Sequence, residues 1–544
     1  MNRFRQSFIC FFSLFFLLPL LQGCSNSDEI EGRSLQEIPS QKSPVYGGTY
    51  RIPLKNNPIT LDPARTVDRY GVPIVEQIFD GLVRFDAYLS VVPALAETWE
   101  VTEKGKVYRF KLKEAVFHNQ ALVTSNDVKF SIQRLLRMEP PSAVLQHLLK
   151  IKGAEAYRME TSEHLTGITI EDDKRFSIRL KQTYIPFLAA LGMYQAAIVP
   201  EKTVLELGDG FGSSPVGTGP FRFVSWEENR SIRLHRFKDY YDGPAFLDDI
   251  FYHIYSSEQN QTLLNDFKLK RLDEMTVGKN AEALAELEGL QWFQRPLLSL
   301  FFYGINTIHP HLADPDLRKA MSAAIDRQRL VNTVYDGQFQ VTRTILPPGM
   351  AGYHRLTETE PDLQLSEPYS GALKADQKEL ELEIVSASKG SWDEAEMAII
   401  QEAWLPLGIR VRPKYITDWK AFNAYLKSGS AQIYRYGWHA DLPDPDSFLS
   451  SLFSSDAAHN FMGFKNRDID SRLRAAREII DPVKRARQYQ RIESKILSDA
   501  PVIPLFYLNV NRVYQPHVQS IRLSPLGAQT TLLNRVWLDK NLNK

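Results

Sequence analysis

The chain has 544 residues, of which 43% are hydrophobic and 11% aromatic, and its formal net charge is zero. It is too apolar for a disordered chain and longer than one hydrophobic core usually supports, so we expect at least two lobes. A zero net charge gives no indication of a nucleic-acid partner, which would need a concentrated basic surface.

The N-terminus has the pattern of a bacterial secretion signal. Arg3 and Arg5 precede an apolar stretch, residues 8–21, that is too short to span a bilayer comfortably. The stretch ends in residues 21–24, Leu-Gln-Gly-Cys, which resemble the lipobox of bacterial lipoproteins. This resemblance implies cleavage before Cys24 and lipidation of that cysteine. The alternative is an ordinary secretory signal with an incidental cysteine.

The segment after Cys24 is predicted to be a tether. Residues 25–43 are polar and contain no aromatic residue, so they cannot bury enough surface to fold. The other cysteine, Cys10, lies within the segment that would be removed, so the mature body would hold no disulfide. We therefore predict a signal peptide at residues 1–23, a flexible tether at 24–44, and a body anchored through Cys24 to a bacterial membrane, in the periplasm or at the cell surface.

The first half of the body is predicted to mix helices and strands. Tyr108, Phe110 and Leu112 alternate with basic residues, which is typical of a half-buried strand, and residues 176–180 repeat this alternation. Between them, Thr124 and Asp127 have the spacing of a capping box and predict the start of a helix.

The second half shows the alternating pattern of a parallel sheet. Asp314-Pro315 predicts the start of a helix that ends at Gly337. Predicted strands at about 380–384, 409–415 and 431–437 then alternate with predicted helices at 392–405 and 418–427. Short helical crossovers of this kind imply parallel strands. Because ligands of such sheets bind beyond the carboxyl ends of the strands, residues 435–446 are the first candidate site.

Residues 438–445, Trp-His-Ala-Asp-Leu-Pro-Asp-Pro, resemble the W-x-A-D-x-P-D-P stretch of the peptide/nickel family of ABC-transporter substrate-binding proteins. Further segments resemble motifs of that family in the same order along the chain, from about residue 46 onward: 61–64, 81–85, 92–99, 117–119, 124–128, 215–221, 306–307, 318–320 and 325–327. Each motif alone is weak, whereas the ordered set is specific.

The resemblance implies an α/β fold of the periplasmic-binding-protein type II, with two lobes and a ligand cleft at a hinge of two crossovers. We expect lobe I at residues 45–302, with 510–544 returning to it, and lobe II at 303–509, with crossovers near 301–306 and 507–511. The implied function is binding of oligopeptides or dipeptides and their delivery to an ABC permease and ATPase complex. We expect a monomer without enzymatic activity or cofactor.

The resemblance also implies the principal ligand contacts. Peptide binders of the family place an aspartate at the position of Asp441, where it pairs with the α-ammonium of the peptide; the alternative is a solvated or helix-capping aspartate. Arg435, on the same strand, would approach the ligand carboxylate, because a guanidinium can bind that group through two hydrogen bonds. The alternative is a surface arginine.

Further candidates lie around the same strand. Trp419 would form an aromatic wall of the side-chain pocket, with a core tryptophan as the alternative. Gly437 and Trp438 belong to the same motif as Asp441, and Tyr507 is a candidate in the returning crossover. Residues 57–61 could offer a strand edge to the ligand backbone.

Four other functions are weighed against this one. A metal site would draw on His439, Asp441, Asp444, Asp446 and His459, but their spacing matches no compact motif, and Asp444 and Asp446 suit turn and cap roles better. A serine-reactive penicillin-binding type of enzyme would need Ser386, Lys389 and the segment 427–429. Relatives on this fold bind nickel complexes, haem, oligosaccharides or antibiotics, and a purely structural lipoprotein would bind nothing. Residues 217–219 are not expected to form a phosphate loop, because no Gly-Lys-Ser/Thr ending follows.

Overall fold

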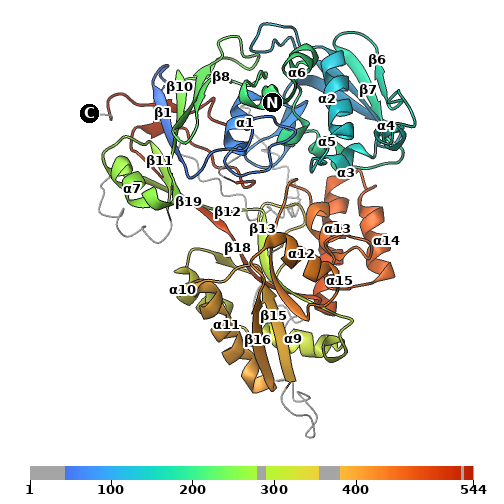
Figure 1. The fold of residues 1–544 in the computed structure, drawn as a ribbon. Coiled ribbons are helices and arrows are strands. Elements are labelled where there is room, and N and C mark those ends of the chain that lie inside the picture. Colours follow the sequence, from blue (N-terminus) through green and yellow to red (C-terminus); the bar gives the residue numbers. More distant parts are fainter. Residues whose placement is uncertain (1–42, 278–288, 355–379, 528–531, 543–544) are drawn as a thin grey trace, which may run out of the picture. The chain divides into compact units, whose positions relative to one another are not determined.

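The computed structural model describes residues 43–277, 289–354, 380–527 and 532–542 (Figure 1). The predicted signal peptide, Cys24 and most of the predicted tether lie outside the described residues. Within the described ranges, no helix combines the length and the apolar character needed to cross a bilayer.

The first half of the chain builds two sheets. One has the strand order β1-β10-β9-β8, in which β1 is parallel to β10; the strands are Thr49–Leu54, Asp249–Ile254, Ser231–Arg236 and Phe221–Glu227. The other is antiparallel with the order β4-β5-β7-β6; its strands are Ala96–Thr102, Val107–Leu112, Arg175–Arg179 and Ile168–Ile170. In β5, Tyr108, Phe110 and Leu112 are buried, which confirms the predicted strand.

Helices cover these sheets and enclose two apolar cores. The helix α2 begins at the predicted capping box, where the Asp127 carboxylate accepts a hydrogen bond from the backbone N–H of Thr124 at 2.9 Å. Two short hairpins, β2–β3 and β20–β21, complete this part. The bounds are α1 Val72–Ile78, α2 Ser125–Arg137, α3 Leu145–Leu148, α4 Ala154–Arg158, α5 Pro186–Ala190, α6 Glu201–Leu207, β2 Val83–Phe85, β3 Val91–Pro93, β20 Val518–Gln519 and β21 Trp537–Leu538.

The second half forms one sheet between two layers of helices. The strand order is β14-β18-β13-β17-β15-β16, and β15 is parallel to both β16 and β17, as the sequence predicted. The strands are β13 Ser299–Ile305, β14 Gln340–Val341, β15 Leu380–Ser386, β16 Ile409–Tyr415, β17 Ile433–His439 and β18 Val502–Tyr507. Alternate residues of each strand face opposite helix layers, because strand side chains have a period of two.

One layer holds α9, α10 and α11, and contacts side chains such as Ile433 on β17. The opposite layer holds α12 to α15 and contacts Tyr434 and Tyr436. The bounds are α9 Pro315–Ala324, α10 Arg327–Tyr335, α11 Ser391–Trp404, α12 Trp419–Lys427, α13 Asp446–Phe453, α14 Arg467–Ala476 and α15 Pro482–Asp499.

The prediction of one continuous helix from Asp314 to Gly337 is wrong in one respect. Asp314 does cap a helix, accepting a hydrogen bond from the N–H of Asp316 at 2.9 Å, but α9 ends at Ala324. The backbone of Ile325 is extended, and Asp326 caps the second helix α10 through the N–H of Arg329. A capping residue inside an apolar repeat therefore divides one predicted helix into two.

Two strand connections join the halves (Figure 1). Strand β12 (Gln291–Pro296) pairs with β19 (Asn509–Tyr514), which also pairs with β11 (Glu274–Thr276), close to α7 (Asn260–Lys268). Beyond the two connections, β13 pairs with β18 in the second-half sheet. At the connections, the N–H of Leu297 donates to the carbonyl of Leu508 at 2.8 Å. Leu297 lies a few residues before the first expected crossover, and Leu508 lies within the second.

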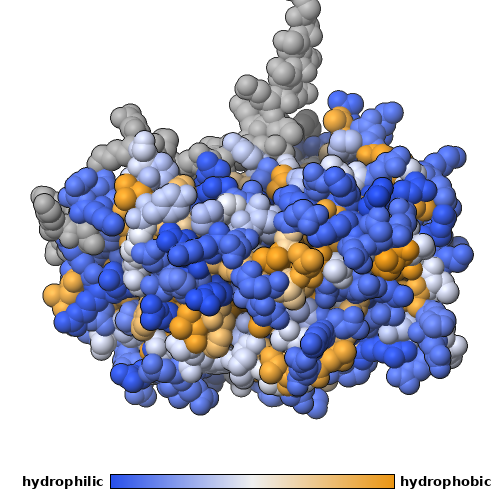
Figure 2. Space-filling view, turned by 90° about the horizontal axis from the view of Figure 1, so that it is seen from above, coloured by the Kyte–Doolittle hydropathy of each residue, from blue (hydrophilic) through white to orange (hydrophobic). Residues whose placement is uncertain are grey.

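The face of the molecule shown in Figure 2 is largely hydrophilic, with apolar residues in small separate patches. The large apolar side chains lie in the cores instead, including the fully buried Trp404 and Trp537. Burial of this apolar surface is the main stabilising contribution.

Candidate ligand-binding site

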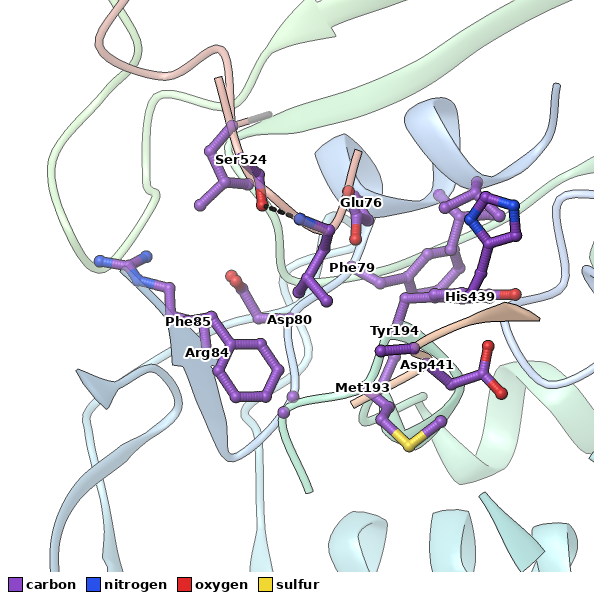
Figure 3. A pocket seen from close by; sticks show the side chains of 18 of the residues that line it. Glu76, Phe79, Asp80, Arg84, Phe85, Met193, Tyr194, His439, Asp441 and Ser524 are labelled. Carbon is purple, nitrogen blue, oxygen red and sulfur yellow. Dashed lines mark hydrogen bonds between the residues drawn. The ribbon is translucent and has the colours of Figure 1, made fainter. Parts of the chain in front are cut away.

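Asp441 lies where the sequence placed it, just beyond the carboxyl end of a parallel strand. Strand β17 ends at His439, and Asp441 follows in the loop that leads to α13. The side chain lines a cavity of about 560 Å³. Residues of the first lobe, including Glu76, Asp80 and Tyr194, form the opposite wall (Figure 3). The cavity thus lies between the two lobes.

The wall opposite Asp441 is fixed by close backbone packing. A Cβ atom on Gly217 would lie 2.1 Å from the carbonyl oxygen of Ile78, and one on Gly219 would lie 2.5 Å from that of Gln77, at the end of α1. Thr218 between them accepts a hydrogen bond from the N–H of Asp80 at 3.3 Å. The Gly-Thr-Gly segment therefore holds the end of α1 at the cavity. The close backbone contacts at positions 217 and 219 require glycine, because a Cβ atom there would clash.

The Asp441 carboxylate is available to a ligand. Among the described residues it has no hydrogen bond or ion pair, and it is exposed to the cavity. The surrounding protein atoms nevertheless displace water and raise the pKa of Asp441 above its usual value. Desolvation lowers the pKa of the neighbouring His439, which favours its neutral form. A bound cation would offset the desolvation of Asp441 directly.

A second cavity of about 620 Å³ adjoins the first, and His439, Leu297 and Arg69 line both. Its charged lining includes Lys55, and also Glu274, which is paired with Arg512. Together the two cavities form one cleft along the boundary between the lobes. These volumes suit a ligand of peptide size better than a single small ion.

Arg435 lies elsewhere. Its Nε donates to Glu396 at 2.9 Å, its Nη2 donates to the hydroxyl of Tyr335 at 2.8 Å, and its guanidinium lies over the ring of Phe301. Arg435 points toward the layer of α9 to α11, and it is absent from the described residues that line the two cavities. The expected contact with a ligand carboxylate therefore has no support in this geometry.

Tyr507 is also occupied within the second lobe. It is buried, and its hydroxyl lies 2.8 Å from both the Thr342 hydroxyl and the carbonyl oxygen of Leu346. Gly437 has a packing role, because a Cβ there would lie 2.7 Å from the ring of Phe301 on the neighbouring strand. Neither residue lines the two cavities in the described part of the chain.

The two tryptophans near the motif have different surroundings. Trp419 begins α12, is 57% exposed, and stacks on Tyr436 with ring centroids 5.8 Å apart. Trp438 donates from Nε1 to the carbonyl of Ser447 at 2.8 Å and packs against His459. Neither tryptophan is among the described residues that line the two cavities, and Trp438 stabilises the loop that carries Asp441.

The strand edge expected at residues 57–61 is not present. Strand β1 ends at Leu54, and the following segment is irregular. The N–H of Ile59 donates to Asp68 at 3.2 Å and the N–H of Leu61 donates to the carbonyl of Gly212 at 3.0 Å, so these two groups are already used. Asparagine and proline in this segment favour turns over extended pairing.

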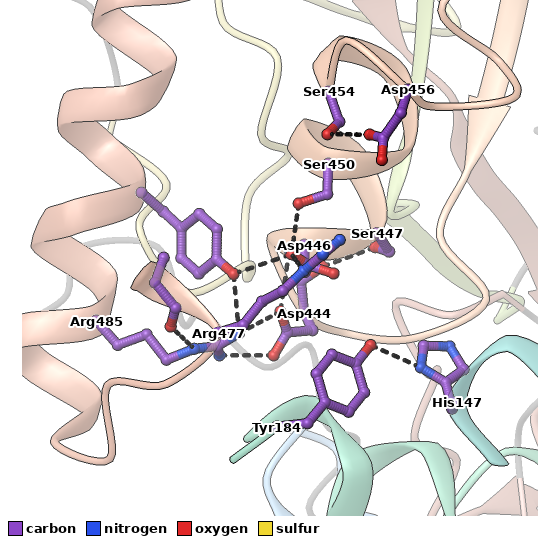
Figure 4. Close-up of polar contacts among 12 residues, drawn as sticks. His147, Tyr184, Asp444, Asp446, Ser447, Ser450, Ser454, Asp456, Arg477 and Arg485 are labelled. Atoms are coloured by element: carbon purple, nitrogen blue, oxygen red, sulfur yellow. Dashed lines mark hydrogen bonds and ion pairs between the residues drawn. The ribbon is translucent and has the colours of Figure 1, made fainter. Parts of the chain in front are cut away.

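Two acids of the cluster considered as a metal site, Asp444 and Asp446, are paired with arginines instead (Figure 4). Asp444 accepts two hydrogen bonds from Arg485, at 2.6 and 2.8 Å, and Asp446 accepts from Arg477 at 2.7 Å. Asp444 also accepts from the N–H of Asp446, the expected turn role. No group of three or more potential metal ligands occurs in the described ranges.

The serine-reactive alternative has the wrong local geometry. Ser386 is the buried last residue of β15 rather than the first residue of a helix, and its hydroxyl accepts from the N–H of Ser388 at 3.3 Å. The ammonium of Lys389 lies 5.8 Å from the centroid of the Tyr415 ring. Lys427 ends α12 and Gly429 follows in the left-handed region, as expected for a helix terminus.

Comparison with known proteins identifies the family. Residues 90–460 match the family described as bacterial extracellular solute-binding proteins, family 5 Middle. The chain belongs to this family. Members of this kind are solute-binding components of ABC importers. The family is extracytoplasmic.

Individual relatives bind different solutes. Haem-binding protein A of Haemophilus influenzae is 26% identical over 480 residues, which cover 83% of this chain and 85% of the relative. The oligopeptide-binding protein OppA of Bacillus subtilis is 25% identical over 504 residues, covering 88% and 91%. The structure of HbpA2 from Haemophilus parasuis aligns with a TM-score of 0.76 at 24% identity, covering 90% of this chain and all of that one. The predicted two-lobed α/β fold of the periplasmic-binding-protein type II is confirmed.

Sequence reasoning missed the first-lobe wall of the cleft. Glu76 and Asp80 belong to no motif of charged residues, and Arg69 lies in a loop. The one available signal was Glu76 itself, a carboxylate within the otherwise mostly apolar helix Val-Pro-Ile-Val-Glu-Gln-Ile.

Proposed function

We propose that this protein binds peptides with a free amino terminus in the cleft between its lobes and delivers them to the permease and ATPase of an ABC importer. The observation that carries the proposal is Asp441, an unpaired carboxylate in the cavity at the carboxyl end of β17. An ammonium group bound there forms a charge pair in a partly desolvated site, where such pairs are strong. Contacts with both lobes would shift the population toward the closed form.

Relatives named for peptide binding support this choice of solute. Besides OppA, they include a di/tripeptide-binding protein of Pseudomonas aeruginosa that is 27% identical over 512 residues. The competing solute is haem, the ligand named for another relative. A peptide is favoured because the free Asp441 carboxylate suits an ammonium group.

Native mass spectrometry of the tag-free protein is the direct test of the solute class. We expect a series of co-purifying masses that correspond to peptides and that disappear after partial unfolding and dialysis. Refolded protein should then bind synthetic tripeptides in titration calorimetry. A co-purifying haem or sugar, with no binding of any peptide, would contradict the proposal.

We further propose that the protein is a monomer attached to a bacterial membrane through lipidated Cys24. Cys24→Ser should abolish incorporation of radiolabelled palmitate and move the protein from the membrane fraction to the soluble fraction, because a thioether-linked lipid supplies the apolar chains that hold the anchor. Unchanged labelling of the variant would contradict the anchor.

A further inference from the structure

Glu76 is a carboxyl group without a partner in the cleft. It extends from α1, lines the cavity that contains Asp441, and its Oε2 is shielded from solvent with no hydrogen-bond partner among the described residues. Burial raises the pKa of Glu76 well above its usual value. An unsatisfied buried carboxyl is costly, and buried polar groups in proteins nearly always have a partner. Its place in a ligand cavity indicates that the ligand supplies this partner.

Asp80 repeats this situation four residues later, just beyond the end of α1. It is only 5% exposed, lines the same cavity, and its Oδ2 also has no hydrogen-bond partner in the described part of the chain. Burial raises the pKa of Asp80 to about 6, although the positive charge of Arg84 opposes the shift. Figure 3 shows Glu76 and Asp80 on the first-lobe side and Asp441 near His439. Three carboxyl groups thus line one cavity.

The arginines of this cavity are hydrogen-bonded to groups other than these acids. Arg84 donates to Asp242 at 2.8 Å and to the hydroxyl of Tyr240 at 3.1 Å. Arg69 lines both cavities, and its guanidinium donates to the hydroxyl of Tyr70 at 3.0 Å. Neither arginine forms an ion pair with Glu76 or Asp80 among the described residues, although the charge of Arg84 still opposes the raised pKa of Asp80. In the lining of this cavity, the three carboxyl groups outnumber the two arginines.

We propose that the ligand carries a second cationic group besides its α-ammonium, and that Glu76 and Asp80 bind it. On the proposed function, on which this inference rests, the second cation is the basic side chain of a lysine or arginine residue in the peptide. A cation is favoured over a neutral donor because it both satisfies the unpaired oxygens and lowers the free energy of the charged carboxylates. The first-lobe wall is then a selectivity site for basic peptides, distinct from the ammonium site at Asp441.

Calorimetry with matched tripeptides tests this selectivity. Alanine tripeptides carrying one lysine at the first, second or third position are compared with the same peptides carrying norleucine, which has nearly the same length but no charge. We expect the lysine peptide to bind at least tenfold more tightly at one position. Glu76→Gln, and separately Asp80→Asn, should reduce this ratio to about threefold or less. Glu206→Gln, on the exposed surface of α6, serves as the matched control and should keep the wild-type ratio.

The outcomes separate this inference from the proposed function. If norleucine peptides bind as tightly as lysine peptides, or if both cavity variants keep the wild-type ratio, the selectivity site is refuted and peptide binding stands. If no peptide of either series binds, both proposals fail. Because the ratio compares two ligands on the same protein sample, a partly unfolded variant does not change it; thermal unfolding without ligand monitors the fold independently.

Discussion

Asp441→Asn is expected to weaken the binding of a free-amine tripeptide by about 2–5 kcal/mol, which corresponds to at least about 30-fold in the dissociation constant. The substitution keeps the size of the side chain and removes only its charge. The described residues offer the Asp441 carboxylate no hydrogen bond or ion pair, so its replacement breaks no internal contact in this part of the protein. Titration calorimetry of the wild type and the variant measures the difference.

An N-acetylated copy of the same tripeptide is the matched control ligand. Acetylation removes the ammonium, so the wild type should bind the acetylated peptide about as weakly as Asp441→Asn binds the free peptide. Asp441→Asn should then bind the acetylated peptide only slightly more weakly than it binds the free peptide, because the substitution and the acetylation remove the two partners of the same charge pair. An Asp441→Asn variant with wild-type affinity for the free peptide would refute the ammonium site.

The position of Asp441 could be predicted because it depends on local patterns. Alternating strands and capped helices give a parallel sheet, and a parallel sheet places the loop after β17 at its ligand-binding edge. What the sequence did not predict is the first-lobe wall of the cavity, which lies opposite Asp441. Glu76 and Asp80 reach the cavity because glycines 217 and 219 pack on the end of α1, a contact between segments more than a hundred residues apart in sequence. No periodicity within one segment contains that information.

The surroundings of Arg435 could not be predicted for the same reason. The alternation of β17 shows that Arg435 faces the side of the sheet opposite to Tyr434 and Tyr436, but not which helix covers that side. Its partner Glu396 lies 39 residues earlier, on the buried face of α11. A carboxylate at a helical spacing that otherwise holds apolar residues is the kind of signal that indicates a buried ion pair, because such a group needs a partner.

Arg435→Met is expected to lower the free energy of unfolding by about 3–5 kcal/mol, because it leaves Glu396 buried without its cation. Glu396 is fully buried and would retain only the hydroxyls of Tyr303 and Tyr335 as donors. Methionine keeps most of the apolar contact that the arginine side chain makes. Chemical denaturation, followed by far-ultraviolet circular dichroism, measures the loss.

Arg329→Met is the matched control for this ion pair. Arg329 on α10 also binds a glutamate of α11, through two hydrogen bonds to Glu402 at 2.9 and 2.8 Å, but both side chains are exposed. Solvent screens exposed pairs, which therefore contribute little to stability, so the control should unfold near the wild-type midpoint. The two variants differ mainly in burial, which is the property that makes Arg435 structural.

The same variant decides between the two roles considered for Arg435. If the arginine supports the second lobe, folded Arg435→Met should bind the free-amine tripeptide within about twofold of the wild type, because Arg435 lies outside the described lining of both cavities. If Arg435 instead binds the ligand carboxylate, Arg435→Met should bind the free peptide more weakly than the wild type does. Amidation of the peptide C-terminus should then weaken binding to the wild type but not to the variant. The ion pair with Glu396 predicts a less stable variant with nearly unchanged affinity. A variant of wild-type stability with strongly reduced affinity would therefore contradict the structural role.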